Sequence, residues 1–314
     1  MILETFESVN QKAVIVQIEF SKGRDDFSPL NAFDEFKELV VSSGAEIARE
    51  DFSKQAKPTS GLFISKGKAE RIKDFVNETE SELVIFNHEL TPSQERNLEN
   101  IFKARVLDRT GLILDIFAER ASSHIGKLQV ELAQLSHLST RLVRGWSHLE
   151  RQKGGIGLRG PGETQLETDR RLINQRIKNI KNKLSKSHKQ REVNRYSRNK
   201  GNQTLVALVG YTNAGKTTLF NLLTESQLYA ADKLFATLDS VTRKNSVTGL
   251  DDILFSDTVG FISDLPTELI ESFKATLDEL KSADLLIHVV DISDPDFIYK
   301  TEQVFLILKE LGIS

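Results

Sequence analysis

The stretch that decides the fold of this chain runs from Gly210 to Thr217 and reads Gly-Tyr-Thr-Asn-Ala-Gly-Lys-Thr. It matches the pattern G-x4-G-K-[ST], follows the apolar run Leu205–Val209, and leads into Lys216–Leu223, which has helical spacing. In a strand–loop–helix unit of this kind, glycines let backbone N–H groups turn around phosphates, and the helix N-terminus adds partial positive charge. The pattern therefore predicts an α/β domain of the P-loop NTPase class.

A second motif supports this interpretation. Ile253–Ser256 is an apolar strand candidate, and Asp257-Thr258-Val259-Gly260 follows it as D-x-x-G. In P-loop proteins an Asp at such a strand end holds Mg²⁺, and a following Gly amide contacts the γ-phosphate. D-x-x-G is a weak signal alone, but its position after the P-loop pattern makes it informative. Lys216 is then expected to reach the β- and γ-phosphates, and Thr217 to offer its hydroxyl to Mg²⁺.

A second Mg²⁺ hydroxyl is expected between these two motifs. The stretch Phe235-Ala236-Thr237-Leu238-Asp239 lies where a switch loop would supply it. By position alone, Thr237 and Thr242 both qualify, and the residues leave that choice open.

Composition excludes several classes of protein. The chain has 314 residues with a formal net charge of −3, and 39% hydrophobic and 28% charged residues indicate a globular protein of two or three domains. It has no cysteine, which excludes thiol catalysis, Fe–S clusters and Cys-based zinc sites. The six histidines show no metal-ligand spacing. No apolar run reaches the roughly 20 residues of a membrane span, and the N-terminus lacks a signal-peptide pattern, so we expect a cytoplasmic protein.

The small net charge hides a strong segregation. Residues 1–140 carry 17 basic and 23 acidic residues, residues 141–200 carry 17 and 5, and residues 201–314 carry 8 and 17, so the net charges are −6, +12 and −9. A run of charge usually marks a solvated face. Here it extends over 60 residues with five glycines in its 154–162 stretch, which favours a polyanionic partner such as RNA.

The patterns along the chain predict three parts. Residues 1–120 alternate strand-like and helix-like segments, with Gly61–Ser65 among the strand candidates and Thr91-Pro92 as the cap and first residue of a helix. Residues 121–200 contain two apolar-periodic stretches around the glycine-rich segment, which predicts an antiparallel helical hairpin with Lys186–Asn202 as helix end and linker. Residues 201–314 form the P-loop domain. The expected fold class is therefore α/β, with an N-terminal α/β domain, an antiparallel helical hairpin and a C-terminal P-loop NTPase domain.

Taken together, these motifs resemble a known family. Residues 154–171, which begin Gly-Gly-Ile-Gly-Leu-Arg-Gly-Pro-Gly-Glu-Thr-Gln, together with 210–217, 235–239 and 257–261, are similar to the HflX family of translational GTPases. The resemblance covers essentially the whole chain, and the glycine-rich stretch is its most family-specific part. It implies Mg²⁺-dependent GTP hydrolysis coupled to binding of the large (50S) ribosomal subunit and its rRNA, including dissociation of stalled or idle ribosomes. It also favours Thr237 over Thr242 as metal ligand. A monomer is expected.

The motifs and the resemblance together give a set of expected site residues. The expected metal ligands are Thr217 and Thr237, and in related potassium-activated GTPases an Asn at the position of Asn213 ligates K⁺; a simple turn-forming Asn is the other interpretation. The expected GTP-binding residues are Gly210, Tyr211, Thr212, Asn213, Ala214, Gly215, Lys216, Thr217, Thr218, Phe235, Ala236, Thr237, Leu238, Asp239, Asp257, Thr258, Val259 and Gly260. The expected RNA-binding residues are Arg159, Arg170, Arg171, Lys178 and Lys181.

The chain departs from the family pattern at Ser240-Val241 and in the missing N-K-x-D motif, and it differs from Ras-type enzymes at Phe261. Ser240-Val241 replace the usual Pro-Thr, which leaves the backbone less constrained. Phe261 follows the D-x-x-G motif where Ras-type enzymes carry a water-orienting Gln, so we expect slow intrinsic hydrolysis that needs a partner. No guanine-reading N-K-x-D motif occurs before Ser314, and we expect a truncated G domain.

Two other functions compete with the GTPase at this point. The chain could be a non-catalytic RNA- or ribosome-binding factor with a defective nucleotide site, in which the basic hairpin does the work. It could also be a P-loop ATPase, because these residues show no preference between guanine and adenine.

Overall fold

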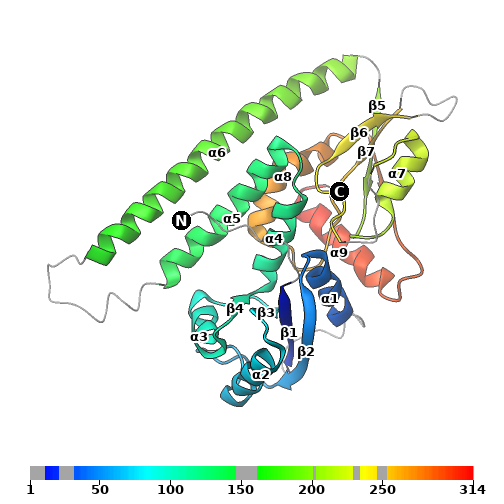
Figure 1. The fold of residues 1–314 in the computed structure, drawn as a ribbon. Helices are drawn as coiled ribbons and strands as arrows, with labels where there is room; N and C mark the ends of the chain where they lie inside the picture. The colour runs from blue at the N-terminus through cyan, green and yellow to red at the C-terminus, as the bar shows by residue number, and fades with distance from the viewer. Residues whose placement is uncertain are drawn as a thin grey trace. The chain divides into compact units, whose positions relative to one another are not determined.

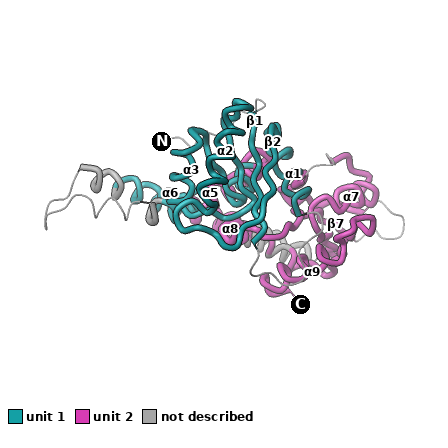
Figure 2. Tube along the Cα trace, turned by 90° about the horizontal axis from the view of Figure 1, so that it is seen from below, with its two compact units in different colours: residues 1–28, 32–115, 134–179 teal, residues 29–31, 116–133, 180–314 magenta. Residues whose placement is uncertain are grey.

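The computed structural model describes residues 11–20, 32–145, 161–200, 203–228, 234–245 and 253–313. The chain divides into two compact units, teal and magenta in Figure 2. Unit 1 contains residues 1–28, 32–115 and 134–179, and unit 2 contains residues 29–31, 116–133 and 180–314. Figure 1 labels the helices of both units and all strands except β8.

Unit 1 is built on a parallel four-stranded sheet. Its strand order is β2-β1-β3-β4, and every neighbouring pair is parallel. Apolar residues of β1 and β3 pack with those of two helices, α2 and α3, in one buried core. This alternation of strands and helices is typical of an α/β layer. The strands are β1 (Lys12–Phe20), β2 (Glu46–Gln55), β3 (Leu83–Phe86) and β4 (Arg105–Leu107), and the helices are α1 (Ala32–Ser42), α2 (Lys66–Thr79), α3 (Pro92–Phe102) and the start of α4 (Arg109–Arg120).

The start of α3 confirms the helix signal predicted from Thr91 and Pro92. The Thr91 hydroxyl accepts a hydrogen bond from the Gln94 backbone N–H, and the Gln94 side chain accepts one from the Thr91 N–H. Pro92 occupies the first turn, where its missing N–H costs nothing. This capping box satisfies two backbone donors at once.

Two long helices follow, α5 (His124–Gly145) and α6 (Pro161–Lys200). Residues 134–145 of α5 fall in unit 1 with residues 161–179 of α6, whereas residues 124–133 fall in unit 2 with residues 180–200. The end of one helix is thus grouped with the start of the other, as an antiparallel hairpin requires.

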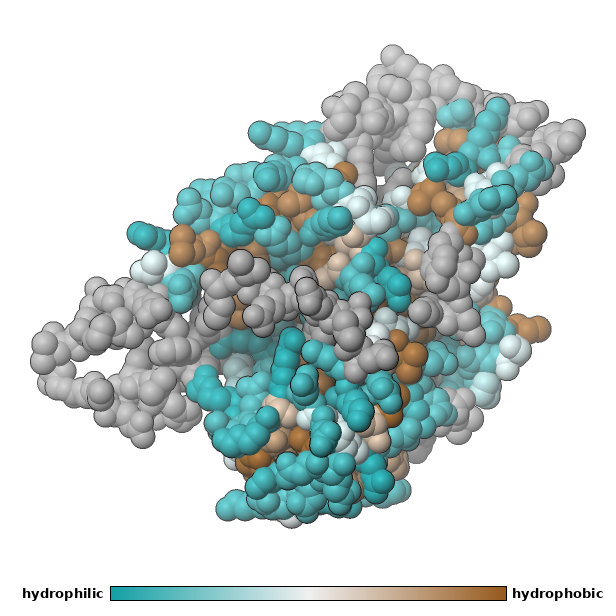
Figure 3. Space-filling view, viewed as in Figure 1, coloured by the Kyte–Doolittle hydropathy of each residue, from teal (hydrophilic) through white to brown (hydrophobic). Residues whose placement is uncertain are grey.

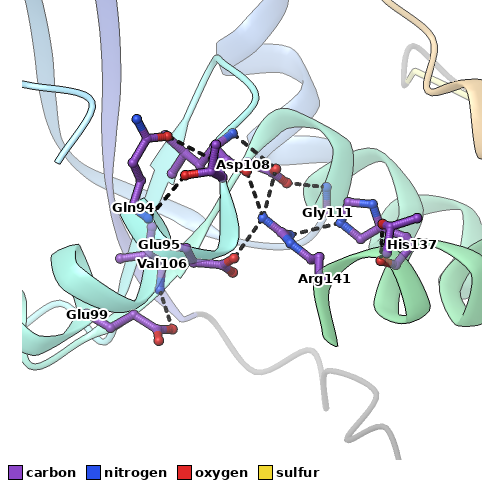
Figure 4. A network of polar contacts seen from close by, with 11 residues as sticks. Gln94, Glu95, Glu99, Val106, Asp108, Gly111, His137 and Arg141 are labelled. Carbon is purple, nitrogen blue, oxygen red and sulfur yellow. Dashed lines mark hydrogen bonds and ion pairs between the residues drawn. The ribbon is translucent and has the colours of Figure 1, made fainter. Parts of the chain in front are cut away.

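In unit 1, a buried ionic network joins α5 to the residues around α3 and β4 (Figure 4). The Arg141 guanidinium lies 2.7 Å from a carboxylate oxygen of Glu95 and 3.1 Å from one of Asp108, which is 1% exposed. It also lies 2.8 Å from the His137 ring nitrogen. Burial raises the pKa of Glu95 to about 7, and Arg141 opposes that rise. Arg141 thus connects α5 with Glu95 of α3 and with the buried Asp108 within this unit.

Unit 2 contains the second four-stranded sheet, in the order β6-β7-β5-β8. Strand β5 lies between β7 and β8 and is parallel to both, and β6 pairs antiparallel with β7. Apolar residues of β5, β7 and α7 form its core. The strands are β5 (Thr204–Val209), β6 (Val241–Lys244), β7 (Ile253–Asp257) and β8 (Leu285–His288), and the helices are α7 (Lys216–Thr224), α8 (Thr267–Lys281) and α9 (Phe297–Glu310).

The predicted α/β fold class with a P-loop domain is confirmed, and two local predictions are wrong. Gly61–Ser65 is not a strand, because in this segment only Phe63 pairs, in an isolated bridge with Thr59. The expected linker from Lys186 is helical as far as Lys200, because no Gly or Pro interrupts these residues. The domain boundaries after residues 120 and 200 stay predictions. None of the helices in the described ranges combines the length and apolarity needed to cross a bilayer.

Candidate nucleotide-binding site

The P-loop begins where β5 ends, at the centre of the unit 2 sheet. Gly210 lies so close to the neighbouring chain segment that an added Cβ would be 2.4 Å from the Val289 carbonyl oxygen. Gly215 has a φ of +87° and precedes the first residue of α7. Larger residues would clash at the first position and be strained at the second. The two glycines therefore set a tight loop whose N–H groups lie at a helix N-terminus, an arrangement that binds phosphate.

Lys216 is the cation of this loop. Its side chain is buried, and its Nζ donates a hydrogen bond of 2.7 Å to the Tyr211 carbonyl oxygen. Burial lowers the pKa of Lys216 to about 8, while the nearby Asp257 carboxylate opposes that change. The carbonyl thus orients the ammonium group within the loop. A bound phosphate would stabilise the charged form of the Lys216 side chain.

Three oxygen-bearing side chains meet next to the loop. The Thr217 hydroxyl donates to Asp257 Oδ2 at 2.7 Å, and its oxygen lies 2.7 Å from the Thr237 hydroxyl oxygen. Asp257 Oδ1 is buried and has no hydrogen-bond partner among the described residues. Burial raises the pKa of Asp257, and the hydrogen bond from Thr217 opposes the rise. Hydroxyl and carboxylate oxygens are the donors that Mg²⁺ prefers, so these residues fit that ion.

The structure also separates the two candidate threonines. Thr237 lies at this oxygen cluster, whereas Thr242 lies in β6, with its hydroxyl 3.4 Å from that of Ser256. Thr242 therefore belongs to the pairing of β6 with β7 and not to the cluster.

The segment after Asp257 closes against the P-loop through its backbone. The Thr212 N–H donates to the Phe261 carbonyl at 2.7 Å, and the Phe261 N–H donates to the Gly210 carbonyl at 3.1 Å. A Cβ on Gly260 would lie 2.8 Å from Thr212 Cα and 3.0 Å from Lys216 Nζ. Only glycine permits this approach, which brings Gly260 close to Thr212 and to the ammonium group of Lys216. The Phe261 side chain is buried and carries no polar group with which to orient water.

Sequence reasoning missed the side-chain contacts that brace this arrangement. The Tyr211 hydroxyl accepts a hydrogen bond of 2.9 Å from the Ser263 N–H and donates one of 3.1 Å to its hydroxyl. Asp239 points to Ser122 and Ser123, which lie far away in the sequence. No motif marks either serine, because the signal is a tertiary contact between distant segments.

The remaining predicted site residues are placed as follows. Asn213 is exposed with a φ of +61°, a conformation that suits a turn. The Thr258 hydroxyl donates to the Leu208 carbonyl at 2.6 Å, and Val259 and Leu238 are buried. Thr218 is exposed at the start of α7, and Ala214 and Ala236 are half-buried. Their roles toward GTP stay predictions.

Of the predicted RNA-binding residues, the four on α6 are exposed. Hydrophilic side chains cover much of the face drawn in Figure 3, including described parts of α6. At 100° per residue, Arg170, Arg171, Lys178 and Lys181 fall within a helix sector of about 100°. Ile180 is buried, outside that sector. Arg159 and most of the glycine-rich segment lie outside the described residues.

Comparison with known proteins identifies the family. Three family models match in sequence order: GTP-binding GTPase N-terminal at residues 31–118, GTP-binding GTPase Middle Region at 120–198, and 50S ribosome-binding GTPase at 205–312. GTPase HflX of Escherichia coli (strain K12) is 52% identical over 301 residues, covering 96% of this chain and 70% of that protein. The chain belongs to the HflX family of GTPases.

Further relatives agree with this assignment. GTPase HflX of Caldanaerobacter subterraneus subsp. tengcongensis is 47% identical over 310 residues, covering 99% of this chain and 71% of that protein. The crystal structure of the SsGBP and GDP complex is 26% identical with a TM-score of 0.54, covering 97% of this chain and 79% of that one. The site described above is thus that of a P-loop enzyme that hydrolyses GTP. The competing ATPase and the factor without catalysis are not supported.

The two threonines provide a direct test of the oxygen cluster in this HflX GTPase. We expect Thr237→Ala to raise the Mg²⁺ concentration for half-maximal GTP hydrolysis by about 10-fold or more, because it removes one hydroxyl from the cluster. Thr242→Ala is the matched control and should leave that concentration unchanged. A Mg²⁺ titration of single-turnover hydrolysis measures both. An equal half-maximal Mg²⁺ concentration for the two variants would show that Thr237 is not a metal ligand.

Proposed function

We propose that this chain is a cytoplasmic GTPase that binds the large (50S) ribosomal subunit as a monomer. It couples GTP binding and hydrolysis to ribosome dissociation, rescue or biogenesis during translation. The observation that carries the proposal is the cluster of Thr217, Thr237 and Asp257 oxygens beside the P-loop, together with a family model described as a 50S ribosome-binding GTPase over residues 205–312.

The chemistry follows from the geometry of the P-loop side. The loop N–H groups, the α7 N-terminus and Lys216 would hold the phosphates, and Gly260 would offer its amide to the γ-phosphate. Thr217, Thr237 and Asp257 would hold Mg²⁺, which supplies neutralising charge when bound. Water attacks the γ-phosphorus while the bond between that phosphorus and the β–γ bridging oxygen breaks, giving GDP and phosphate.

The missing step is the orientation of the attacking water. Phe261 occupies the position of the water-orienting Gln of Ras-type enzymes and is buried. We infer that a partner orders the site. Single-turnover GTP hydrolysis should therefore be faster with purified 50S subunits than without them. Equal rates in the two measurements would contradict this part of the proposal.

The basic face of α6 is the proposed contact to rRNA. A charge reversal there, Arg171→Glu with Lys178→Glu, should weaken 50S binding about 10-fold or more. It should also make the dependence of log affinity on log salt concentration shallower, by about 1 for each phosphate that the variant no longer neutralises. The matched control is Lys57→Glu with Lys66→Glu, two exposed lysines outside α6 that change the net charge equally. Sedimentation binding at several salt concentrations measures the slope for each double variant. If both double variants weaken binding equally, the effect comes from net charge and not from the α6 face.

Asn213 is the proposed K⁺ ligand. Because its φ is positive, Asn213→Gly removes the side chain without straining the backbone. We expect wild-type hydrolysis to be faster in KCl than in NaCl, and the variant to lose that difference. If the wild-type rates are the same in both salts, Asn213 is a turn residue only.

A further inference from the structure

Asp239 makes a set of contacts that the nucleotide site does not explain. Within unit 2, its Oδ2 accepts hydrogen bonds from the Ser122 N–H at 3.1 Å, the Ser122 hydroxyl at 2.8 Å and the Ser123 N–H at 2.7 Å. Its Oδ1 accepts a fourth from the Ser123 hydroxyl. The carboxylate thus accepts hydrogen bonds from four donors just before α5.

These donors lie at the N-terminus of α5. The Ser123 hydroxyl also accepts a hydrogen bond of 2.8 Å from the Gly126 N–H, as a helix cap does. A negative charge is stabilised at this end of a helix, where backbone N–H groups lack intrahelical partners. Burial alone would raise the pKa of Asp239, but the hydrogen bonds from Ser123 and Ser122 outweigh it and hold that pKa below its usual value.

Gly126 shows how closely the two segments approach. A Cβ at this position would lie 2.3 Å from Asp239 Oδ1, far inside any real contact distance. Glycine is a weaker helix former than alanine, by up to about 1 kcal/mol in a helix interior. At this position the missing side chain leaves room for the Asp239 carboxylate.

The other end of the same short segment is also held. The Phe235 side chain is buried, and its ring centroid lies 4.6 Å from that of Phe117, edge to face. Phe117 in turn contacts Phe273 of α8, with 5.5 Å between ring centroids. Residues 117–126 therefore hold the segment 235–239 at both ends, by an aromatic pair and by the carboxylate cap.

Thr237 lies between these two anchors. Its hydroxyl reaches Thr217, although residues 234–240 contain no regular helix or strand to hold it there. We propose that Asp239 is a positioning residue for GTP hydrolysis: its bonds to Ser122 and Ser123 fix the segment 235–239 so that Thr237 meets Thr217 and Asp257. This inference adds to the GTPase activity a contact from the middle region, whose family model starts at residue 120.

The contact has a thermodynamic consequence. If Thr237 is ordered by metal and nucleotide, the cap on α5 is strengthened, and a stable cap must favour metal and nucleotide by the same free energy. The first turn of α5 and the occupancy of the metal site are then linked through Asp239.

Three variants test the proposal. Asp239→Asn replaces one acceptor oxygen by an amide NH2 group, which cannot accept hydrogen bonds from the serine donors. Ser122→Ala removes one hydroxyl and leaves the Ser123 cap in place. Gly126→Ala improves helix propensity but displaces the carboxylate, which separates positioning from helix stability. The matched control is Asp291→Asn, an exposed carboxylate that accepts bonds from the Ser293 N–H and hydroxyl at 2.9 and 2.6 Å.

Two readouts decide the outcome. In single-turnover hydrolysis, Asp239→Asn and Gly126→Ala should raise the half-saturating Mg²⁺ concentration about 10- to 100-fold, with a smaller change for Ser122→Ala and none for Asp291→Asn. In Asp239→Asn, hydrogen exchange without nucleotide should accelerate at residues 235–239 and 124–127 and stay unchanged in β5. Wild-type exchange at residues 235–239 in Asp239→Asn would overturn the proposal. So would an equal loss of protection in β5, which would show a purely structural role.

The exchange measurement does not depend on the ribosome. If 50S subunits fail to stimulate hydrolysis, the ribosomal proposal fails while the effect of Asp239 on residues 235–239 can still be observed. The two proposals therefore fail separately.

Discussion

The rest of the site depends on the contacts of the Thr217 hydroxyl with Asp257 and Thr237. This hydroxyl belongs to the first turn of α7, donates to Asp257 at the end of β7, and meets Thr237 from a segment without regular structure. Three separate pieces of chain are thereby joined at one oxygen. Thr217 and Asp257 belong to a helix and a strand, whereas Thr237 does not, so the geometry of a metal site here depends on what holds Thr237.

That support comes from outside the sheet. Phe117, Ser122 and Ser123 lie around the end of α4 and the start of α5, and they bind the two ends of residues 235–239. The carboxylate of Asp239 is matched to four donors, which an amide could not satisfy. A middle region that ends in a basic helix thus begins with a contact to the segment that carries Thr237. Under the proposal made above, a change at the start of α5 changes the order of Thr237.

The sequence predicted the parts of the fold and of the site that local chemistry specifies. Gly210, Gly215 and Lys216 form a loop recognisable from spacing alone, and Thr91-Pro92 marks a helix start through its side-chain acceptor and missing N–H. Position could not separate Thr237 from Thr242, because that choice depends on where β6 begins. Ser122 and Ser123 could not be found, because a serine pair before a helix is an ordinary cap until its distant partner is known.

The errors in the predicted fold have similar physical causes. Gly61–Ser65 has apolar residues as a strand does, but only Phe63 pairs, in an isolated bridge with Thr59, so pairing with a neighbouring strand is what the pattern lacks. The stretch after Lys186 is polar and basic, which resembles a linker, but it lacks any residue that would stop a helix. Composition therefore indicates solvent exposure there without deciding conformation.

The most direct measurement of the role of Thr237 and its support is a crystal structure of this chain with Mg²⁺ and a non-hydrolysable GTP analogue. We expect the hydroxyl oxygens of Thr217 and Thr237 at about 2.1 Å from the metal, with the Asp239 carboxylate still bound to Ser122 and Ser123. A metal whose ligand shell is complete without Thr237, with Asp239 detached from the start of α5, would contradict this expectation.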